Sequence, residues 1–434
     1  MTSLPYSGKT LTPLFKTNDI LLILSVILIC IAPAISSFCI VCAFILNIFR
    51  MFKYDIHTFM FDIMTLMPFA NIYKLAPKTP SLVLILILLG LLWFTIKKIK
   101  SANIYTPVVF IAVIYLTIRS GFLIDALLSI ICSLALVCLF ARNAEDKDVI
   151  KVAYGYIVSV AFSVIVAYLT QGTNLYIDYI SDDIQVSQFS DAVRFKGLFS
   201  DPNYLGTYLL SGISILFQLL IMRKIRITYF MGLLFILTFG GLLSYSKGFF
   251  LTFIAIMILS IYNLWKSGNK KSAFIFLTLL GIASIYAIRG AFSDVNIILD
   301  RFRQDSNIDD LTTGRTSLWA KYAQDIFSNL HTFLIGHGLD SPLLIQGAHN
   351  LYLESFYYIG GVGLFLIIAS YISSFKSSIE RFKHYNISYK GIAALTLVVL
   401  LAIYWSLQGL FGFATYFQFF IAILMFRLPS LKKE

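Results

Sequence analysis

The run from Ser81 to Ile96 reads SLVLILILLGLLWFTI and contains no charged residue. Similar apolar runs recur along almost the whole chain, and many approach the roughly 20 residues that cross a bilayer as a helix. Of the 434 residues, 59% are hydrophobic and 13% are charged, which is about half the charged fraction of a soluble domain. The sequence therefore predicts an all-α polytopic membrane protein, forming a single membrane domain over residues 1–434, and argues against a soluble protein.

We expect about 14 membrane-spanning helices (roughly 12–14), because the apolar runs are separated by short hydrophilic gaps. The expected spans are 19–36, 37–52, 58–73, 81–96, 104–118, 122–141, 149–169, 203–222, 227–245, 248–265, 272–289, 350–374, 391–408 and 411–427. Two longer hydrophilic loops, residues 170–202 and 290–349, interrupt this pattern. Ionisable groups are costly inside a bilayer, so we look for chemistry where such groups gather.

Positive charge gives the chain an expected orientation. If the N-terminus lies inside and the spans alternate, about two-thirds of the 34 Lys and Arg residues fall in the inside gaps, as the positive-inside rule requires. Both termini are then cytoplasmic, and both long loops face outward. The net charge of +12 is explained by this orientation, and we expect no nucleic-acid partner.

The larger loop, 290–349, contains a predicted amphipathic helix that begins at Arg315. Its apolar positions recur at helical spacing and are Leu318, Trp319, Tyr322, Ile326 and Leu330. Such a helix is expected to lie on the membrane face or on the helix bundle.

Four side chains of the outer side are candidates for a single site: Arg194, Lys247, Arg315 and His349. Guanidinium and ammonium groups bind phosphate, and an imidazole can take or give a proton. Together they suit a substrate with a diphosphate and a hydroxyl group to be activated. The alternatives are a solvated or headgroup-binding charge for Arg194 and helix capping for His349, whereas Lys247 lies between two apolar spans, where a charge is costly.

Several motifs of other enzyme classes are missing from the sequence. It contains no P-loop, no glycine-rich nucleotide loop and no HExxH pair. The acidic residues Asp305, Asp309 and Asp310 do not form a DxD motif. We therefore expect neither a soluble sugar-nucleotide donor nor a metal-dependent transferase, and we expect no metal and no cofactor.

Five blocks of sequence resemble, in order, those of the O-antigen ligase/polymerase family. The first, GLFSDPN ending at Asn203, is similar to the family's G-x-F-x-x-P-N segment. The second, SYSKG from Ser244 to Gly248, is similar to its Ser-(Arg/Lys)-(Gly/Ala) turn. The remaining three are Gly314-Arg315-x-x-x-Trp319, Gly336-His337-Gly338 and His349-Asn350-x-Tyr352-Leu353. They cover roughly Arg194 to Phe365, and the flanking spans match only in hydropathy.

This resemblance implies a metal-independent, inverting glycosyltransferase of the bacterial inner membrane. It implies that the loops 170–202 and 290–349 are periplasmic, and that the donor is a glycan on undecaprenyl diphosphate. By position, Arg194 and Lys247 would bind the donor diphosphate, and His349 would activate or position the acceptor. The supporting residues would be Arg315, Asn203 and His337. Many family members have Arg where this chain has Lys247, so the bidentate part of the analogy is weakened, but not the charge.

Within this family, we interpret the chain as a polymerase that joins O-antigen or capsular repeat units. A ligase that transfers the glycan to lipid A–core is the alternative, and the motifs do not separate the two. A flippase or transporter is a third hypothesis, but it would place charged groups near the bilayer midplane between repeats. The expected partners are the lipid-linked donor and acceptor, the lipid bilayer and a chain-length regulator protein.

Overall fold

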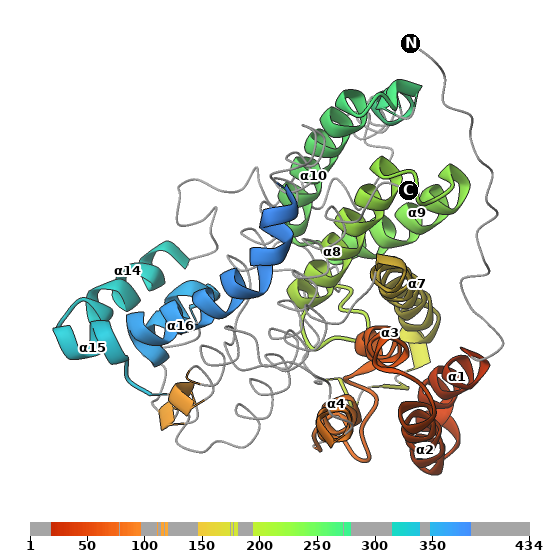
Figure 1. Ribbon diagram of the computed structural model, residues 1–434, viewed down its shortest axis with the longest axis horizontal. Helices are drawn as coiled ribbons and strands as arrows, with labels where there is room; N and C mark the ends of the chain where they lie inside the picture. The colour runs from red at the N-terminus through yellow and green to blue at the C-terminus, as the bar shows by residue number, and fades with distance from the viewer. Residues whose placement is uncertain are drawn as a thin grey trace.

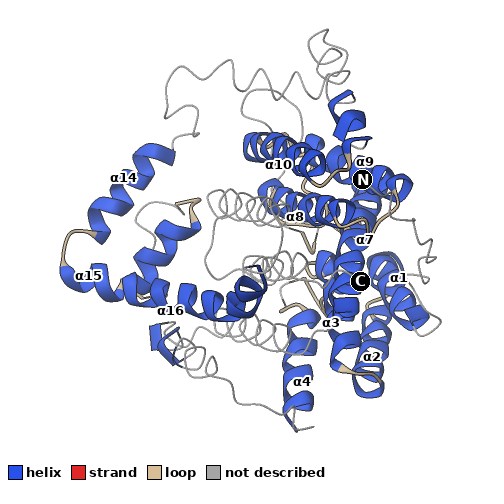
Figure 2. Cartoon of the chain, turned by 45° about the horizontal axis from the view of Figure 1, so that its top comes forward, coloured by secondary structure: helices blue, strands red, loops and turns tan. Residues whose placement is uncertain are grey.

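The computed structural model describes residues 19–77, 79–96, 146–173, 194–271, 273–278, 315–338 and 348–382, together with 111, 114–116, 118–119, 175–176 and 178–180 (Figure 1). Every regular element in these residues is a helix, which confirms the expected all-α class for this part of the chain (Figure 2). The predicted spans 122–141, 391–408 and 411–427 lie outside the described residues. The predicted spans 104–118 and 272–289 and the loops 170–202 and 290–349 are described only in part.

The helices follow one another along the chain with short connections. They are α1 (Ile20–Ile35), α2 (Phe38–Lys53), α3 (Ile56–Leu66), η2 (Met67–Phe69), α4 (Leu82–Ile96), α7 (Asp146–Thr170), η3 (Gln171–Thr173), α8 (Pro202–Ile221), α9 (Ile227–Leu243), α10 (Lys247–Lys266), α14 (Arg315–Ile326), α15 (Leu330–Ile335) and α16 (Leu351–Phe382).

Three of the described helices are long and apolar enough to cross a membrane. They are Asp148–Thr173, which joins most of α7 to η3, Pro202–Ile221 and Lys247–Lys266. Shorter apolar helices accompany them at Ile20–Ile35, Ile56–Phe69, Leu82–Phe94 and Ile227–Leu243. The described bundle thus has the character of a membrane protein.

Helix α8 forms the centre of this bundle. Of its apolar window, 94% is buried, against 44% for α10, because α8 packs between α7, α9 and α10. Such a helix is apolar on all sides, and burial is the stable place for it. At its inner end, the Phe217 ring packs against Phe230 at 5.0 Å and Phe276 at 5.5 Å between centroids. The position of α8 fixes where the loop before it, with Arg194 and Asp201, meets the other helices.

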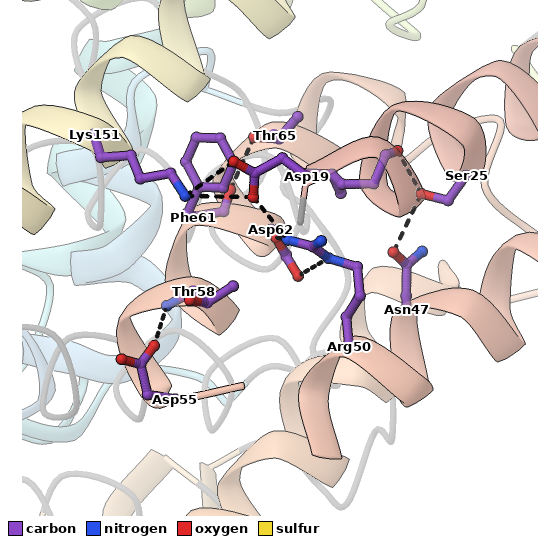
Figure 3. Close-up of polar contacts among 11 residues, drawn as sticks. Asp19, Ser25, Asn47, Arg50, Asp55, Thr58, Phe61, Asp62, Thr65 and Lys151 are labelled. Carbon is purple, nitrogen blue, oxygen red and sulfur yellow. Dashed lines mark hydrogen bonds and ion pairs between the residues drawn. The ribbon is translucent and has the colours of Figure 1, made fainter. Parts of the chain in front are cut away.

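A buried ion cluster joins α1, α2, α3 and α7 at one end of the bundle (Figure 3). Arg50 binds Asp62 through two contacts, Nε–Oδ2 at 2.8 Å and Nη2–Oδ1 at 2.7 Å, and reaches Asp19 at 3.2 Å. Lys151 also pairs with Asp19 at 3.2 Å. The sequence had assigned Arg50 to an inside gap between spans, but it lies within α2 and is 0% exposed. Its charge is therefore used to hold helices together, since it has two carboxylate partners.

Other contacts join the opposite ends of these helices. The Asn71 side chain donates to the Leu198 carbonyl at 3.0 Å, and the Tyr176 hydroxyl donates to the Cys30 carbonyl at 2.8 Å. Both contacts pair segments that alternation of the spans assigns to the same side. The Asp19 cluster does so at the other end. The helix ends are therefore grouped as alternation requires.

The predicted amphipathic helix is α14, and its apolar face packs on the bundle side. Leu318, Tyr322 and Ile326 form a small core with Ala348 and Tyr357. The expected continuation of this face is wrong, because α14 ends at Ile326 and Leu330 begins α15. That break forms because Asn329 caps α15 by accepting from the Thr332 amide at 2.8 Å. Leu330 is 72% exposed there.

The backbones of α15 and α16 cross at two glycines. Gly336 has φ 75° and Gly360 has φ 64°, and a Cβ atom at either position would lie 2.4–2.7 Å from backbone atoms across the crossing. Only glycine allows this approach at these torsions. The predicted uninterrupted span 350–374 is therefore wrong, because α16 is broken at Gly360 and extends to Phe382. The crossing holds α14 and α15 against the first half of α16.

Candidate functional site

The starts of α8 and α10 are joined by side chains. Asp201 caps α8 by accepting from the Asn203 amide at 2.6 Å, and Ser246 caps α10 by accepting from the Phe249 amide at 3.3 Å. The Ser246 hydroxyl also donates to Asn203 Oδ1 at 3.0 Å. The two helices lie side by side in both views (Figures 1 and 2). Lys247, the first residue of α10, is thereby brought to the beginning of α8.

Arg194 lies against the turn that precedes Lys247. Its Nε donates to the Ser244 carbonyl at 3.1 Å, and the amide of Phe195 donates to the Leu243 carbonyl at 3.0 Å. The segment before α8 thus runs along the end of α9. The two residues predicted to bind a diphosphate, Arg194 and Lys247, are carried by neighbouring backbone segments, and both are half-buried.

Arg315 and His349 approach the same region from the other side. Arg315 is the first residue of α14, and His349 precedes α16. The charges of both interact with the Asp201 carboxylate, which also caps α8. Burial lowers the pKa of the Arg315 guanidinium, and Asp201 opposes this effect. Asp201 is therefore the residue through which the loop before α8 meets α14 and α16.

His349 is held in its neutral form. Burial is the main cause that lowers its pKa from 6.5 to about 4, the Arg315 charge adds to the effect, and Asp201 opposes it. A neutral imidazole at physiological pH can accept a proton from a hydroxyl group. His349 also has φ 50°, an uncommon torsion for a residue other than glycine.

Helix starts gather in this region together with cations, which is an unfavourable combination without an anion. Lys247 and Arg315 are the first residues of α10 and α14. The helix macrodipole disfavours a cation at this position by about 0.3–1 kcal/mol, whereas it favours an anion. Backbone amides at helix starts bind phosphate for the same reason. The arrangement is suited to a phosphate-bearing ligand.

His337 lies apart from these groups. Its Nε2 pairs with the Asp325 carboxylate, and its ring packs on Tyr357 with centroids 4.5 Å apart. Its amide donates to the Tyr357 carbonyl at 2.8 Å. His337 thus links α14 and α15 to α16, which agrees with a supporting position away from the reacting groups.

Sequence reasoning missed two acidic residues of this region, Asp201 and Glu354. Asp201 was noted only as one member of an acidic loop, although Asp followed by Pro is a common helix start, with Asp as the cap and Pro at the first turn. Glu354 is 1% exposed and accepts from the His349 amide at 3.2 Å. The signal in its case was a charged residue in the first turn of an apolar helix.

Among the described residues, no three His, Cys, Asp or Glu side chains are grouped so that they could hold a metal ion. Comparison of the chain with protein-family models, with curated proteins and with solved structures finds no match.

Proposed function

We propose that the chain is a membrane glycosyltransferase of the O-antigen ligase/polymerase type, acting as a polymerase of O-antigen or capsular repeat units. Its donor would be a glycan on undecaprenyl diphosphate. The observation that carries this proposal is the meeting of the starts of α8, α10, α14 and α16, with cations at two of them and a neutral histidine at a third.

The donor diphosphate is assigned to Arg194 and Lys247. When the bond from the sugar to the carrier breaks, negative charge grows on the departing diphosphate, and fixed cations stabilise it. Arg194 can form two parallel hydrogen bonds with phosphate oxygens, and Lys247 supplies a point charge. Since these cations neutralise the leaving group, the proposal includes no metal and no cofactor.

The acceptor hydroxyl is assigned to His349. Its oxygen attacks the anomeric carbon on the face opposite the diphosphate and forms the new glycosidic bond. The bond between that carbon and the diphosphate oxygen breaks, and the diphosphate leaves with the electron pair. The neutral imidazole of His349 takes the hydroxyl proton. The anomeric configuration is therefore inverted.

A membrane scaffold suits this substrate because the polyprenyl tail stays in the bilayer while the sugar reacts at its surface. We place the reaction at the periplasmic face of the bacterial inner membrane, with both termini cytoplasmic and about 14 spans in the full chain, as the positive-inside pattern indicates. The acceptor is a second lipid-linked repeat unit, and a chain-length regulator is the protein partner we expect.

A ligase is the second candidate, because it uses the same donor and differs only in its acceptor, lipid A–core. Deleting the protein separates the two. Lipid A–core that carries a single repeat unit identifies a polymerase, whereas core without any repeat, with accumulating lipid-linked polymer, identifies a ligase. A flippase is disfavoured because the candidate cations lie at helix starts and not in the middle of the helices.

The central experiment is complementation of a deletion strain with His349→Ala, read as the polysaccharide ladder on a gel. We expect the ladder to be lost. His331→Ala is the matched control, because His331 is exposed on α15, and it should restore the ladder. A normal ladder with His349→Ala would remove His349 from the proposed mechanism.

A further inference from the structure

The peptide bond between Ala348 and His349 is held by two side chains from different helices. Trp319 of α14 donates from Nε1 to the Ala348 carbonyl at 2.7 Å. Glu354 of α16 accepts from the His349 amide at 3.2 Å. In a trans peptide unit, the carbonyl and the amide point in opposite directions. The two side chains therefore hold the same rigid unit from opposite sides.

The residue that follows this peptide bond needs such support. His349 has φ 50°, and a non-glycine residue keeps such a torsion only where its surroundings hold it. On its other side, Asn350 Oδ1 accepts from the amides of Tyr352 and Leu353 at 3.0 and 3.3 Å, and so fixes the start of α16. The backbone on both sides of His349 is therefore constrained, and with it the direction of the imidazole.

Glu354 is an expensive choice for a helix-end hydrogen bond alone. A carboxylate that is 1% exposed loses its hydration, whereas an exposed Ser or Asp could bond to the same amide at little cost. The Glu354 charge also interacts with the hydroxyl of Tyr204, the residue after Asn203 on α8. Glu354 is thus buried between the turn that carries His349 and the helix that begins at the proposed donor site.

We propose that Trp319 and Glu354 are positioning residues that aim the His349 imidazole by holding the Ala348–His349 peptide unit. This inference rests on the proposed role of His349 as the proton acceptor. Neither side chain touches the reacting atoms, so their effect on the reaction passes through His349. Because Trp319 belongs to α14, docking of that helix is also coupled to the orientation of His349.

The first test measures polymerisation by the purified full-length chain with a lipid-linked repeat unit. Trp319→Phe and Glu354→Leu should each lower kcat by about ten-fold, the order expected when a buried polar group loses its hydrogen bond, with the donor KM unchanged. Glu354→Gln keeps an acceptor oxygen and should stay within about two-fold of the unaltered chain. The double variant Trp319→Phe with Glu354→Leu should lose less than the product of the single losses, since both act on one peptide unit. Equal losses for Glu354→Gln and Glu354→Leu, or a raised donor KM, would overturn the proposal.

The second test does not depend on catalysis. In a chain whose five cysteines are replaced by Ser, His349→Cys supplies a thiol whose rate of reaction with a soluble maleimide reports its orientation. Glu354→Leu and Trp319→Phe should change this rate several-fold, and Glu354→Gln should not. A thiol introduced by Lys321→Cys, on the exposed side of α14, should react at one rate in all backgrounds.

The two tests separate the possible failures. If His349→Ala keeps full activity, the proposed mechanism fails, but the labelling rates still decide whether the peptide unit is held. If the labelling rate is the same in Glu354→Leu as in the parent chain, the positioning role is wrong even where His349 is essential.

Discussion

Arg50 and Asp62 form an ion pair with two parallel contacts, at 2.8 Å and 2.7 Å, inside a bundle where Arg50 is 0% exposed. Such a pair is costly to bury, and it is retained only when the geometry is good and the other hydrogen-bonding atoms find partners. Here Asp19 takes another contact of Arg50, and Lys151 balances Asp19 (Figure 3). The cluster therefore joins α1, α2, α3 and α7 as one unit.

Removing one member of this cluster should strongly destabilise the protein. We expect Arg50→Ala to lower the free energy of unfolding by about 3–5 kcal/mol, because two carboxylates remain buried without their cation. Arg50→Lys should be intermediate, since a single ammonium group cannot reproduce both contacts with Asp62. Chemical denaturation in mixed micelles measures the change. Lys53→Ala, at an exposed position of the same helix, is the control and should stay within about 0.5 kcal/mol.

The Ser246–Asn203 contact should matter for donor binding. Ser246→Ala removes the cap of α10, worth about 1 kcal/mol, and also the hydrogen bond that joins α10 to α8. We expect a raised KM for the lipid-linked donor. Ser246→Thr keeps the hydroxyl and is the matched variant that should retain function. If Ser246→Ala binds donor as the unaltered chain does, the junction of α8 and α10 is not part of the donor site.

Much of the described fold could be predicted from hydropathy. The predicted spans 203–222 and 227–245 correspond closely to α8 and α9, because continuous apolar composition determines where a helix can be buried. The pairing of Arg50 with Asp19 and Asp62 could not be predicted, since it depends on which helices become neighbours. The break at Gly360 was missed because a glycine in an apolar run is usually compatible with a helix, and only the contact with Gly336 reveals its torsion.

The candidate site was predicted in outline. Sequence order and charge suggested that Arg194, Lys247, Arg315 and His349 gather on one side, and the structure brings Arg194 to the turn before Lys247 and the other two to Asp201. Their chemical roles stay predictions. Asp201 was missed because its electrostatic role comes from residues more than one hundred positions further along the chain, which no local pattern contains.

The two donor-side cations should differ in what replacement they accept. Arg194→Ala should lower kcat/KM by about ten- to one-hundred-fold, from ~1.5–3 kcal/mol for a hydrogen bond to a charged group. Arg194→Lys should lose less, and Lys247→Arg should stay active because the charge is kept. Lys270→Ala, an exposed position after α10, is the matched control. Equal activity of Arg194→Ala and the unaltered chain would remove Arg194 from the donor site.

The proposed orientation can be measured with introduced thiols. In a chain whose own cysteines are replaced by Ser, Leu75→Cys lies in the exposed segment after η2, and Lys270→Cys lies in the exposed segment after α10. A maleimide that does not cross the inner membrane should label the first in cells with a permeable outer membrane, and the second only after the inner membrane is opened. The reverse result would invert the topology and place the candidate site in the cytoplasm.

The pH profile should report on His349 and on the charges around it. Its pKa is lowered to about 4 by burial and by Arg315, so the neutral imidazole should persist well below its ordinary value of 6.5. Because the unfolded chain binds this proton first, the His349 contribution to stability is lost as pH falls from 6.5 towards about 4, and it is constant above 6.5. The acid limb of kcat should lie near the lower value.

Changing the two neighbouring charges should move this acid limb in opposite directions. Arg315→Leu removes a cation that lowers the pKa of His349, so the limb should shift towards 6.5, whereas Arg315→Lys keeps the charge and should leave it in place. Asp201→Asn removes the anion that raises the pKa, so the limb should shift further towards acid. Each profile is normalised to its own maximum, which separates the shift from any loss of donor binding. A limb that stays fixed in Arg315→Leu and in Asp201→Asn would show that another group takes the proton, because the titration of His349 must respond to both charges.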